Sequence, residues 1–229
     1  MRLVYVHGIN QINTDPVSAK QAWDLDLFGR ENPNSRLVYW GDLSVVQQMK
    51  MGLSFSDLML CEILKLGTAN ALLKDVHNYF YEDYVRIEVL RRFTRALPED
   101  PTEPCVVIGH SQGSVIAYDG LIQAEIHHNC KSFITMGSPL GLHTVMAELR
   151  RLNNLSSLPV PKQIKKWNNY RDRLDPVALQ KTLKGNYTGA ISPEDDFVTN
   201  IDDHINPHSL PGYLKTRAVR NSVAEAILL

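Results

Sequence analysis

The chain has 229 residues, of which 44% are hydrophobic and 21% are charged, a composition typical of an ordinary globular protein and of neither a collagen-like nor a disordered one. Its 24 lysines and arginines balance 25 aspartates and glutamates, so no net charge favours nucleic acid or an anionic membrane as a partner. We therefore expect a single domain over residues 1–229 whose partner is a small molecule.

The sequence shows neither a targeting pattern nor a membrane-spanning one. Its first residues enter an apolar run directly, without the basic region and hydrophobic core of a secretory signal. No apolar run approaches the roughly 18 residues that cross a bilayer. The three cysteines, Cys61, Cys105 and Cys130, lack metal-ligand spacing, and their odd number does not suggest a disulfide framework. We expect a cytoplasmic protein without stable membrane insertion.

Short apolar runs alternate with longer segments of helical spacing along the chain. The segment Pro16–Phe28 is of the helical kind, with Asp15 as its N-cap and Pro16 at the first helical position. Buried parallel strands are typically continuous apolar runs. The alternation therefore predicts an α/β fold, in which one mostly parallel central sheet carries helices on both faces. The runs that we expect to be strands are residues 3–6, 37–40, 105–108 and 133–136.

Residues 42–97 form a long insertion between two expected strands, where one crossover helix would suffice. Helix starts are indicated at Ser56-Asp57 and at Asn78, and Pro98 lies beyond the last turn, so we expect three helices. The middle of the insertion is more apolar than a solvated hairpin requires. It either packs as core or covers a substrate site as a lid or an acyl pocket, and the sequence leaves both interpretations open.

The C-terminal part of the chain is richer in loops. Residues 163–167 are a candidate strand followed by a polar turn at 168–175, and residues 184–209 are mostly loop with two short strand-like pieces. The Gly-Ser-Pro-Leu sequence at 137–140 is interpreted as a turn between a strand and a helix. A final amphipathic helix is expected from residue 211 to about residue 228.

The strongest signal in the chain is Gly109-His110-Ser111-Gln112-Gly113, which matches the G-x-S-x-G nucleophile elbow. It directly follows an expected strand and precedes a helix in which apolar residues recur at helical spacing. The strand-to-helix turn requires small residues two positions on either side of the serine, and both glycines meet this requirement. The helix start directs free N–H groups above Ser111, so we expect the backbone N–H of Gln112 to donate to an oxyanion.

The elbow in this context resembles the α/β-hydrolase superfamily, in particular its lipase and esterase branch. The segment Val6-His7-Gly8-Ile9-Asn10 is similar to the His-Gly sequence that supplies the second oxyanion donor in lipases, which implies that role for the backbone N–H of Ile9. Only one residue precedes the strand that leads to this segment, so the resemblance implies an α/β-hydrolase fold lacking the first two strands. The shortened sheet would expose an edge with which a second copy of the chain can pair as a homo-oligomer.

In this superfamily the triad runs serine, acid, histidine along the chain, so the acid and the base are sought after residue 111. His208 is favoured over His204, because His208-Ser209 followed by Tyr213 resembles the closing motif of related hydrolases. For the acid, Asp175-Pro176-Val177 resembles the acid loop of many such enzymes, although an aspartate before a proline is also an ordinary helix N-cap. The less favoured acids are Asp172, Asp202 and Asp203.

Together these residues predict a serine hydrolase that cleaves a carboxylic ester of a small or lipid-like substrate through an acyl-enzyme intermediate. Ser111 would attack the carbonyl, His208 would carry the proton and Asp175 would orient the imidazole. This chemistry implies no cofactor and no metal. The alternatives are an acyltransferase or a thioesterase with the same triad, or a binding protein that kept the fold without the chemistry.

Overall fold

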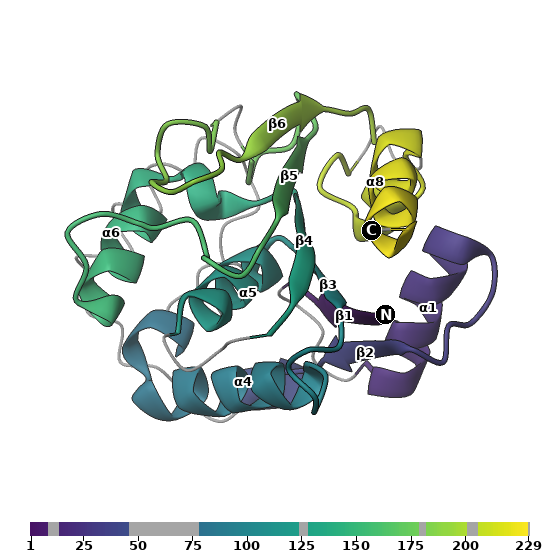
Figure 1. Ribbon diagram of the computed structural model, residues 1–229, viewed down its shortest axis with the longest axis horizontal. Coiled ribbons are helices and arrows are strands. Elements are labelled where there is room, and N and C mark those ends of the chain that lie inside the picture. The colour runs from purple at the N-terminus through teal and green to yellow at the C-terminus, as the bar shows by residue number, and fades with distance from the viewer. Residues whose placement is uncertain (9–13, 46–77, 124–127, 179–181, 201–205, 229) are drawn as a thin grey trace.

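A computed structural model describes residues 1–8, 14–45, 78–123, 128–178, 182–200 and 206–228 (Figure 1). Its six described strands form one sheet in the order β2-β1-β3-β4-β5-β6, and every neighbouring pair is parallel. The predicted α/β fold with a parallel sheet is thereby confirmed. The strands are β1 (Arg2–Val6), β2 (Ser35–Val38), β3 (Cys105–His110), β4 (Cys130–Met136), β5 (Lys166–Arg171) and β6 (Glu194–Phe197).

Helices cover both faces of the sheet, as Figure 1 shows. Successive side chains of a strand point to opposite faces. Val107 of β3 therefore joins one buried apolar cluster, while its neighbour Val106 joins the other. The first cluster lies under α4 (Asp83–Ala96), α5 (Gln112–Ile122) and α6 (His143–Asn153). The second lies under α1 (Pro16–Phe28), α7 (Leu210–Leu214) and α8 (Arg217–Leu228).

Helix α1 begins and ends where its sequence predicts. The carboxylate of Asp15 accepts a hydrogen bond from the backbone N–H of Ser18 at 2.8 Å, which satisfies one of the free donors of the first turn. Pro16 occupies the first turn, where its missing N–H costs nothing. Gly29 ends the helix in the left-handed conformation with φ 69°.

Strand β5 corrects the prediction of a strand at 163–167 followed by a polar turn. The strand spans Lys166–Arg171, so Asn168 and Asn169 lie inside the sheet, and both are buried. Asn169 accepts from Thr135 at 2.8 Å and donates to Asp195 at 2.8 Å, and the amide nitrogen of Asn168 donates to Glu194 at 3.1 Å. Buried polar groups are stable when they are hydrogen-bonded. Polarity at these positions therefore reflects pairing between strands and not a turn.

Two other boundaries also differ from the prediction. Strand β2 spans Ser35–Val38 and not residues 37–40, because Trp40 bonds to His7 instead of a neighbouring strand. The final helix is divided into α7 and α8. Thr216 lies at the division, where its hydroxyl donates to the carbonyl of Tyr213 at 2.8 Å. A side-chain hydroxyl that bonds to the backbone in this way is typical of a helix boundary.

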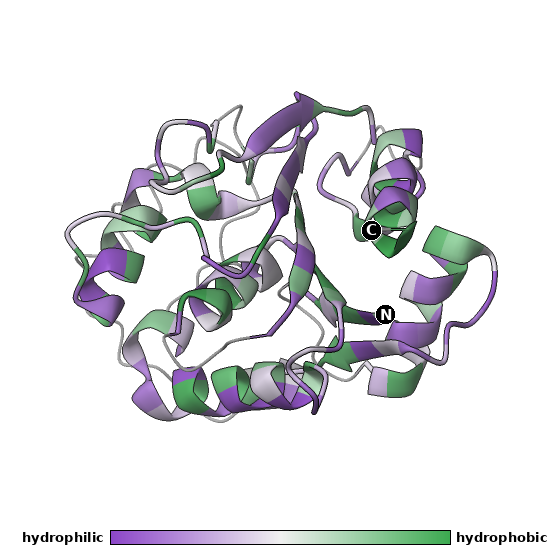
Figure 2. Cartoon of the chain, in the orientation of Figure 1, coloured by the Kyte–Doolittle hydropathy of each residue, from purple (hydrophilic) through white to green (hydrophobic). Residues whose placement is uncertain are grey.

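The edges of the sheet are formed by β2 and β6. Strand β6 carries the sequence Glu-Asp-Asp-Phe, and Figure 2 shows it as mostly hydrophilic. Charged edge strands resist pairing with other chains. None of the described helices is long and apolar enough to cross a membrane. Of the predicted insertion, residues 46–77 lie outside the described part, which contains η1 (Gly41–Val45) and α4.

The chain order places a crossover point in the middle of the sheet. From β1 the chain passes to β2 on one side and later to β3 on the other, and β1 pairs with both. In open parallel sheets, ligands bind beyond the carboxyl ends of the strands at the point where the strand order reverses. Here that point lies between β1 and β3, which are followed by His7-Gly8 and by Ser111 respectively.

Candidate active site at the strand crossover

Ser111 has an unusual backbone conformation at the turn between β3 and α5. Its φ of 55° and ψ of −132° lie outside the regions that residues with a Cβ atom ordinarily occupy. Such conformations cost about 1–3 kcal/mol and persist only where the surrounding structure holds them. Here the N–H of Ser111 donates to the carbonyl of Met136 at 3.0 Å. The strained turn presents the serine at the carboxyl edge of the sheet, as a nucleophile elbow requires.

Helix α5 begins very close to β1, and a glycine permits the approach. A Cβ atom on Gly113 would lie 2.1 Å from the carbonyl oxygen of Val6 and 2.4 Å from that of His7. Any side chain at this position would therefore separate the helix from the strand. The glycine that the sequence motif specifies thus has a physical role in bringing the start of α5 beside the end of β1.

The structure brings together the three residues that the sequence predicts as a triad. The Nε2 atom of His208 lies 2.9 Å from the Oγ of Ser111, although the two residues are 97 positions apart. The Nδ1 atom of the same ring lies 2.9 Å from each carboxylate oxygen of Asp175. Since a carboxylate oxygen accepts, Nδ1 carries the proton and Nε2 is free to accept the hydrogen of Ser111. This is the arrangement of a nucleophile, a base and an orienting acid.

Asp175 is held in its charged form by its surroundings. Its side chain is fully buried, and burial by itself opposes ionisation. The charge of His208 and hydrogen bonds from His208 and from the hydroxyl of Tyr213 outweigh that effect, so the pKa of Asp175 lies below its ordinary value. Tyr213 donates at 2.6 Å, and the backbone N–H of Val177 donates at 2.8 Å. Asp175 is thus a carboxylate across the neutral pH range.

Asp172, the nearest alternative acid, has other partners. Its carboxylate accepts from the N–H of Leu174 at 2.8 Å and from the N–H of Asn200 at 2.7 Å. These contacts connect the end of β5 to the loop after β6. The imidazole of His208 bonds instead to the carboxylate of Asp175. The remaining alternatives, His204, Asp202 and Asp203, lie outside the described residues.

His110 contacts His208 directly, and no local sequence pattern predicts this contact. Its ring lies 4.8 Å from the ring of His208 between centroids, and its Nε2 donates to the carbonyl of His208 at 3.0 Å. Burial, with a further effect from His208, lowers the pKa of His110 to about 3. His110 is therefore neutral at neutral pH and supports the loop of the base without placing a second charge beside it.

His7 fixes the turn that follows β1. Its Nε2 accepts the backbone N–H of Trp40 at 3.0 Å, so Nδ1 carries the proton and donates to the carbonyl of Gly8. Burial lowers the pKa of His7 to about 4 and keeps the ring neutral. The expected oxyanion donor Ile9 comes directly after this turn but lies outside the described residues.

Gln112 begins helix α5, so its backbone N–H has no acceptor within the helix. Free N–H groups and the positive end of the helix dipole make such a position favourable for a negatively charged oxygen. The side-chain amide of Gln112 is fully buried, and neither of its polar atoms has a hydrogen-bond partner among the described residues.

Gly137 borders the triad from the end of β4. Its φ is 54°, and a Cβ atom at this position would lie 2.8 Å from the Oδ2 of Asp175 and 3.0 Å from the Nδ1 of His208. The Gly-Ser-Pro-Leu sequence does connect a strand to a helix, since its Pro139 and Leu140 belong to η3 (Pro139–Gly141), which precedes α6. Its glycine has the further role of leaving room for the base and the acid, which the glycine after an expected strand could have indicated.

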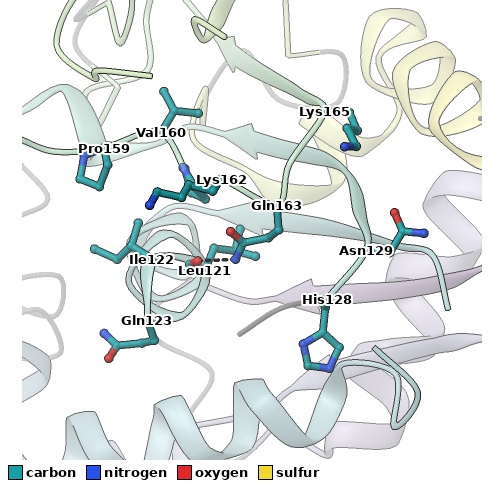
Figure 3. Close-up of a pocket in the computed structure, with 11 residues that line it drawn as sticks. Leu121, Ile122, Gln123, His128, Asn129, Pro159, Val160, Lys162, Gln163 and Lys165 are labelled. Atoms are coloured by element: carbon teal, nitrogen blue, oxygen red, sulfur yellow. Dashed lines mark hydrogen bonds between the residues drawn. The ribbon is translucent and has the colours of Figure 1, made fainter. Parts of the chain in front are cut away.

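Two clefts differ in their relation to these residues. A cleft of about 430 Å³ is lined by Arg173 and Leu174 on the loop of the acid and by Pro207 beside the base, and its apolar walls include the exposed Leu174. A cavity of about 590 Å³ lies at the amino ends of β4 and β5, between the end of α5 and the segment 159–165 (Figure 3). No triad residue lines either cavity, but the first lies beside the loops that carry Asp175 and His208.

No group of three or more histidine, cysteine, aspartate or glutamate side chains is arranged for metal binding within the described part of the chain.

Comparisons with known proteins add nothing to the geometry. No protein-family model matches the chain, and no curated protein matches it significantly. The interpretation of the site therefore depends on its own atoms.

Proposed function

We propose that the chain is a serine hydrolase of the α/β-hydrolase type that cleaves carboxylic esters through an acyl-enzyme. The observation that carries the proposal is the hydrogen-bonded row Ser111–His208–Asp175 at a strained strand-to-helix turn. A strained backbone and a buried carboxylate are costly, and they are retained where function needs them. The same three residues were predicted from the order of motifs along the chain.

In the first half of the reaction, the Oγ of Ser111 attacks the carbonyl carbon of the ester. Its proton passes to the Nε2 of His208, and the charge of Asp175 stabilises the imidazolium that forms. The bond between the carbonyl carbon and the leaving oxygen then breaks, and His208 gives its proton to that oxygen. The alcohol departs and leaves the acyl group on Ser111.

In the second half, water attacks the acyl carbon and gives its proton to His208. The ester bond to Ser111 breaks, the Oγ recovers the proton from His208, and the carboxylic acid departs. The negative oxygen of each tetrahedral intermediate is proposed to accept from the backbone N–H of Gln112 and from that of Ile9. The groups that carry these steps all belong to the chain, so the proposal includes no cofactor.

We propose that an apolar portion of the substrate binds in the cleft beside Pro207, the residue before His208. Leu174 is 72% exposed and Phe197 is 43% exposed, and both line the 430 Å³ cleft that Pro207 borders. Exposed apolar side chains that gather at a cleft are typical of ligand sites. We therefore propose a small or lipid-like ester. Transfer of the acyl group to an alcohol and hydrolysis of a thioester would use the same triad.

We also propose a cytoplasmic location. Cys105 and Cys130 are register partners on the neighbouring strands β3 and β4, and both are buried free thiols. Free cysteines in this relation fit a reducing compartment. Expression of the native chain followed by alkylation of denatured protein with and without reductant would test it, since a disulfide in the cell extract would contradict the proposal.

The decisive experiment for the enzyme is covalent labelling with a fluorophosphonate. Intact protein should gain the mass of one phosphonyl group, and peptide mapping should place it on Ser111. Ser111→Ala should prevent both labelling and turnover of a p-nitrophenyl ester. The control is Ser132→Ala, which changes another buried serine within β4 and should leave labelling intact. Full labelling of Ser111→Ala would overturn the proposal.

A further inference from the structure

We infer that Tyr213 is a positioning residue for the acid of the triad, an inference that rests on the proposed function. Its hydroxyl donates to the Oδ2 of Asp175 at 2.6 Å. The phenol oxygen of Tyr213 also accepts a hydrogen bond from the backbone N–H of Asp172 at 2.8 Å. One hydroxyl of α7 thus joins the carboxylate of the acid to the end of β5, and it does so from a fully buried ring.

The other donors to Asp175 cannot fix its position in the same way. Apart from His208, they are the backbone N–H groups of Val177 and Ala178, which belong to the loop of Asp175 and would move with it. Tyr213 belongs to α7, on a different part of the chain, and packs in the apolar cluster under that helix. Among the described contacts of Asp175, the Tyr213 hydroxyl is therefore the link between the carboxylate and the rigid core.

The hydroxyl of Tyr213 acts as a donor over the whole working pH range. Burial and the charge of Asp175 raise the pKa of Tyr213 well above its ordinary value, so the phenol does not ionise. Among the described residues, the titratable groups that face the acid and the base are Tyr213, Asp172 and His110. Burial keeps His110 neutral, and the carboxylate of Asp172 accepts a hydrogen bond from the backbone N–H of Leu174. Removal of the Tyr213 hydroxyl therefore takes a hydrogen-bond donor from Asp175 and alters the electrostatic interaction of that carboxylate with His208.

Loss of this donor has a specific consequence for catalysis. The hydrogen bond from the phenol stabilises the negative charge of the Asp175 carboxylate. Without this hydrogen bond, the carboxylate attracts the proton of His208 more strongly. The acid limb of the profile of kcat/KM against pH should therefore move upward. The loss also releases the carboxylate, so kcat should fall roughly ten- to one-hundredfold. KM should change little, because the side chain of Tyr213 is fully buried.

The variant Tyr213→Phe tests the inference, and Tyr170→Phe is its matched control. Tyr170 packs in the same buried cluster, and its hydroxyl pairs with Ser222 at 2.6 Å, away from the triad. Tyr213→Phe removes two hydrogen bonds of a buried hydroxyl and Tyr170→Phe removes one, and both keep the ring, so a loss of stability is common to both. Only Tyr213→Phe should lower kcat and move the acid limb upward. Equal effects of the two variants, or an unmoved acid limb, would overturn the inference.

A spectroscopic measurement separates this inference from the proposed function. The low-field proton NMR signal of the His208 Nδ1–H reports its hydrogen bond to Asp175 whether or not any ester is cleaved. Tyr213→Phe should shift or broaden this signal, while Tyr170→Phe should leave it unchanged. An unchanged signal in Tyr213→Phe would overturn the positioning role. Failure of the native chain to label with a fluorophosphonate would instead contradict the hydrolase itself.

Discussion

The ring of His110 packs against the ring of His208 at 4.8 Å between centroids, and its Nε2 donates to the His208 carbonyl. His110 is the residue before the nucleophile, so the elbow itself supports the loop of the base. A protonated His110 would place a positive charge beside His208 and would oppose its protonation during the reaction. Because burial lowers the pKa of His110 to about 3, the contact remains neutral throughout the working pH range.

The first prediction concerns stability at acid pH. An unfolded histidine titrates near pH 6.5, while folding lowers the pKa of His110 to about 3 and that of His7 to about 4. Between these values the unfolded chain binds protons that the folded chain does not, so the free energy of unfolding falls as the pH falls below 6.5. Each histidine contributes up to about 1.4 kcal/mol per pH unit in that window. Above it, neither contributes.

Urea unfolding at several pH values from about 7 to about 5 would measure this slope. His110→Gln removes one titrating group and retains an N–H donor for the His208 carbonyl, so its stability should depend less steeply on pH. His143→Gln is the control, because it changes a histidine at the exposed start of α6. Identical slopes for the native chain and His110→Gln would contradict the lowered pKa of His110.

The second prediction concerns the choice of base. Nε2 of His208 lies 2.9 Å from the Oγ of Ser111, within the reach that proton transfer requires. His208→Ala should therefore lower kcat by several orders of magnitude, roughly a thousandfold or more. His204→Ala should matter far less. Steady-state hydrolysis of a p-nitrophenyl ester by both variants decides the matter, and the reverse ranking would remove His208 from the mechanism.

The third prediction separates the two aspartates. Asp175→Asn removes the charge that orients His208 and stabilises its cation, so kcat should fall by roughly a thousandfold or more. Asp172→Asn weakens the buried bonds to Leu174 and Asn200, so it should lower the free energy of unfolding by about 1–3 kcal/mol. Its effect on kcat should be much the smaller of the two. Kinetics and urea unfolding of both variants measure the two effects, and an equal loss of kcat would mean that Asp175 has no special role.

Sequence reasoning found the parts of the site that depend on local pattern and chain order. The elbow around Ser111 is a strand, a turn and a helix in succession, and each leaves a signal within a few residues. The order of the triad in related hydrolases restricted the search to residues after Ser111, and the local resemblance to their acid loop and closing motif favoured Asp175 and His208. These features were accessible because they do not depend on which distant side chains come together.

The features that were missed depend on contacts between distant segments. Asn168 and Asn169 were interpreted as a turn because their partners lie on other strands, where Asp195 supplies the acceptor for Asn169. The hydroxyl of Tyr213 reaches Asp175 across 38 positions, and no local pattern announces that bond. Polarity and motif order are local properties, whereas the pairing of buried polar groups is decided by the fold.

The last prediction concerns Gly137, whose substitution should disturb the triad from outside it. Gly137→Ala introduces both backbone strain and a steric clash. The residue has φ 54°, and its Cβ would lie 2.8 Å from Asp175 and 3.0 Å from His208. The control Gly185→Ala introduces backbone strain alone, since its φ is 83° and nothing lies within 4 Å of the added atom.

Each variant should lose about 1–2 kcal/mol of stability to backbone strain, as unfolding in urea would show. Only Gly137→Ala should also lose kcat, by about a hundredfold, since an added methyl group must push the base or the acid away by several tenths of an ångström. If both variants kept the native kcat while Gly137→Ala was folded, the turn after β4 would tolerate the atom, and the close packing of Gly137 against His208 would have no part in holding the base in position.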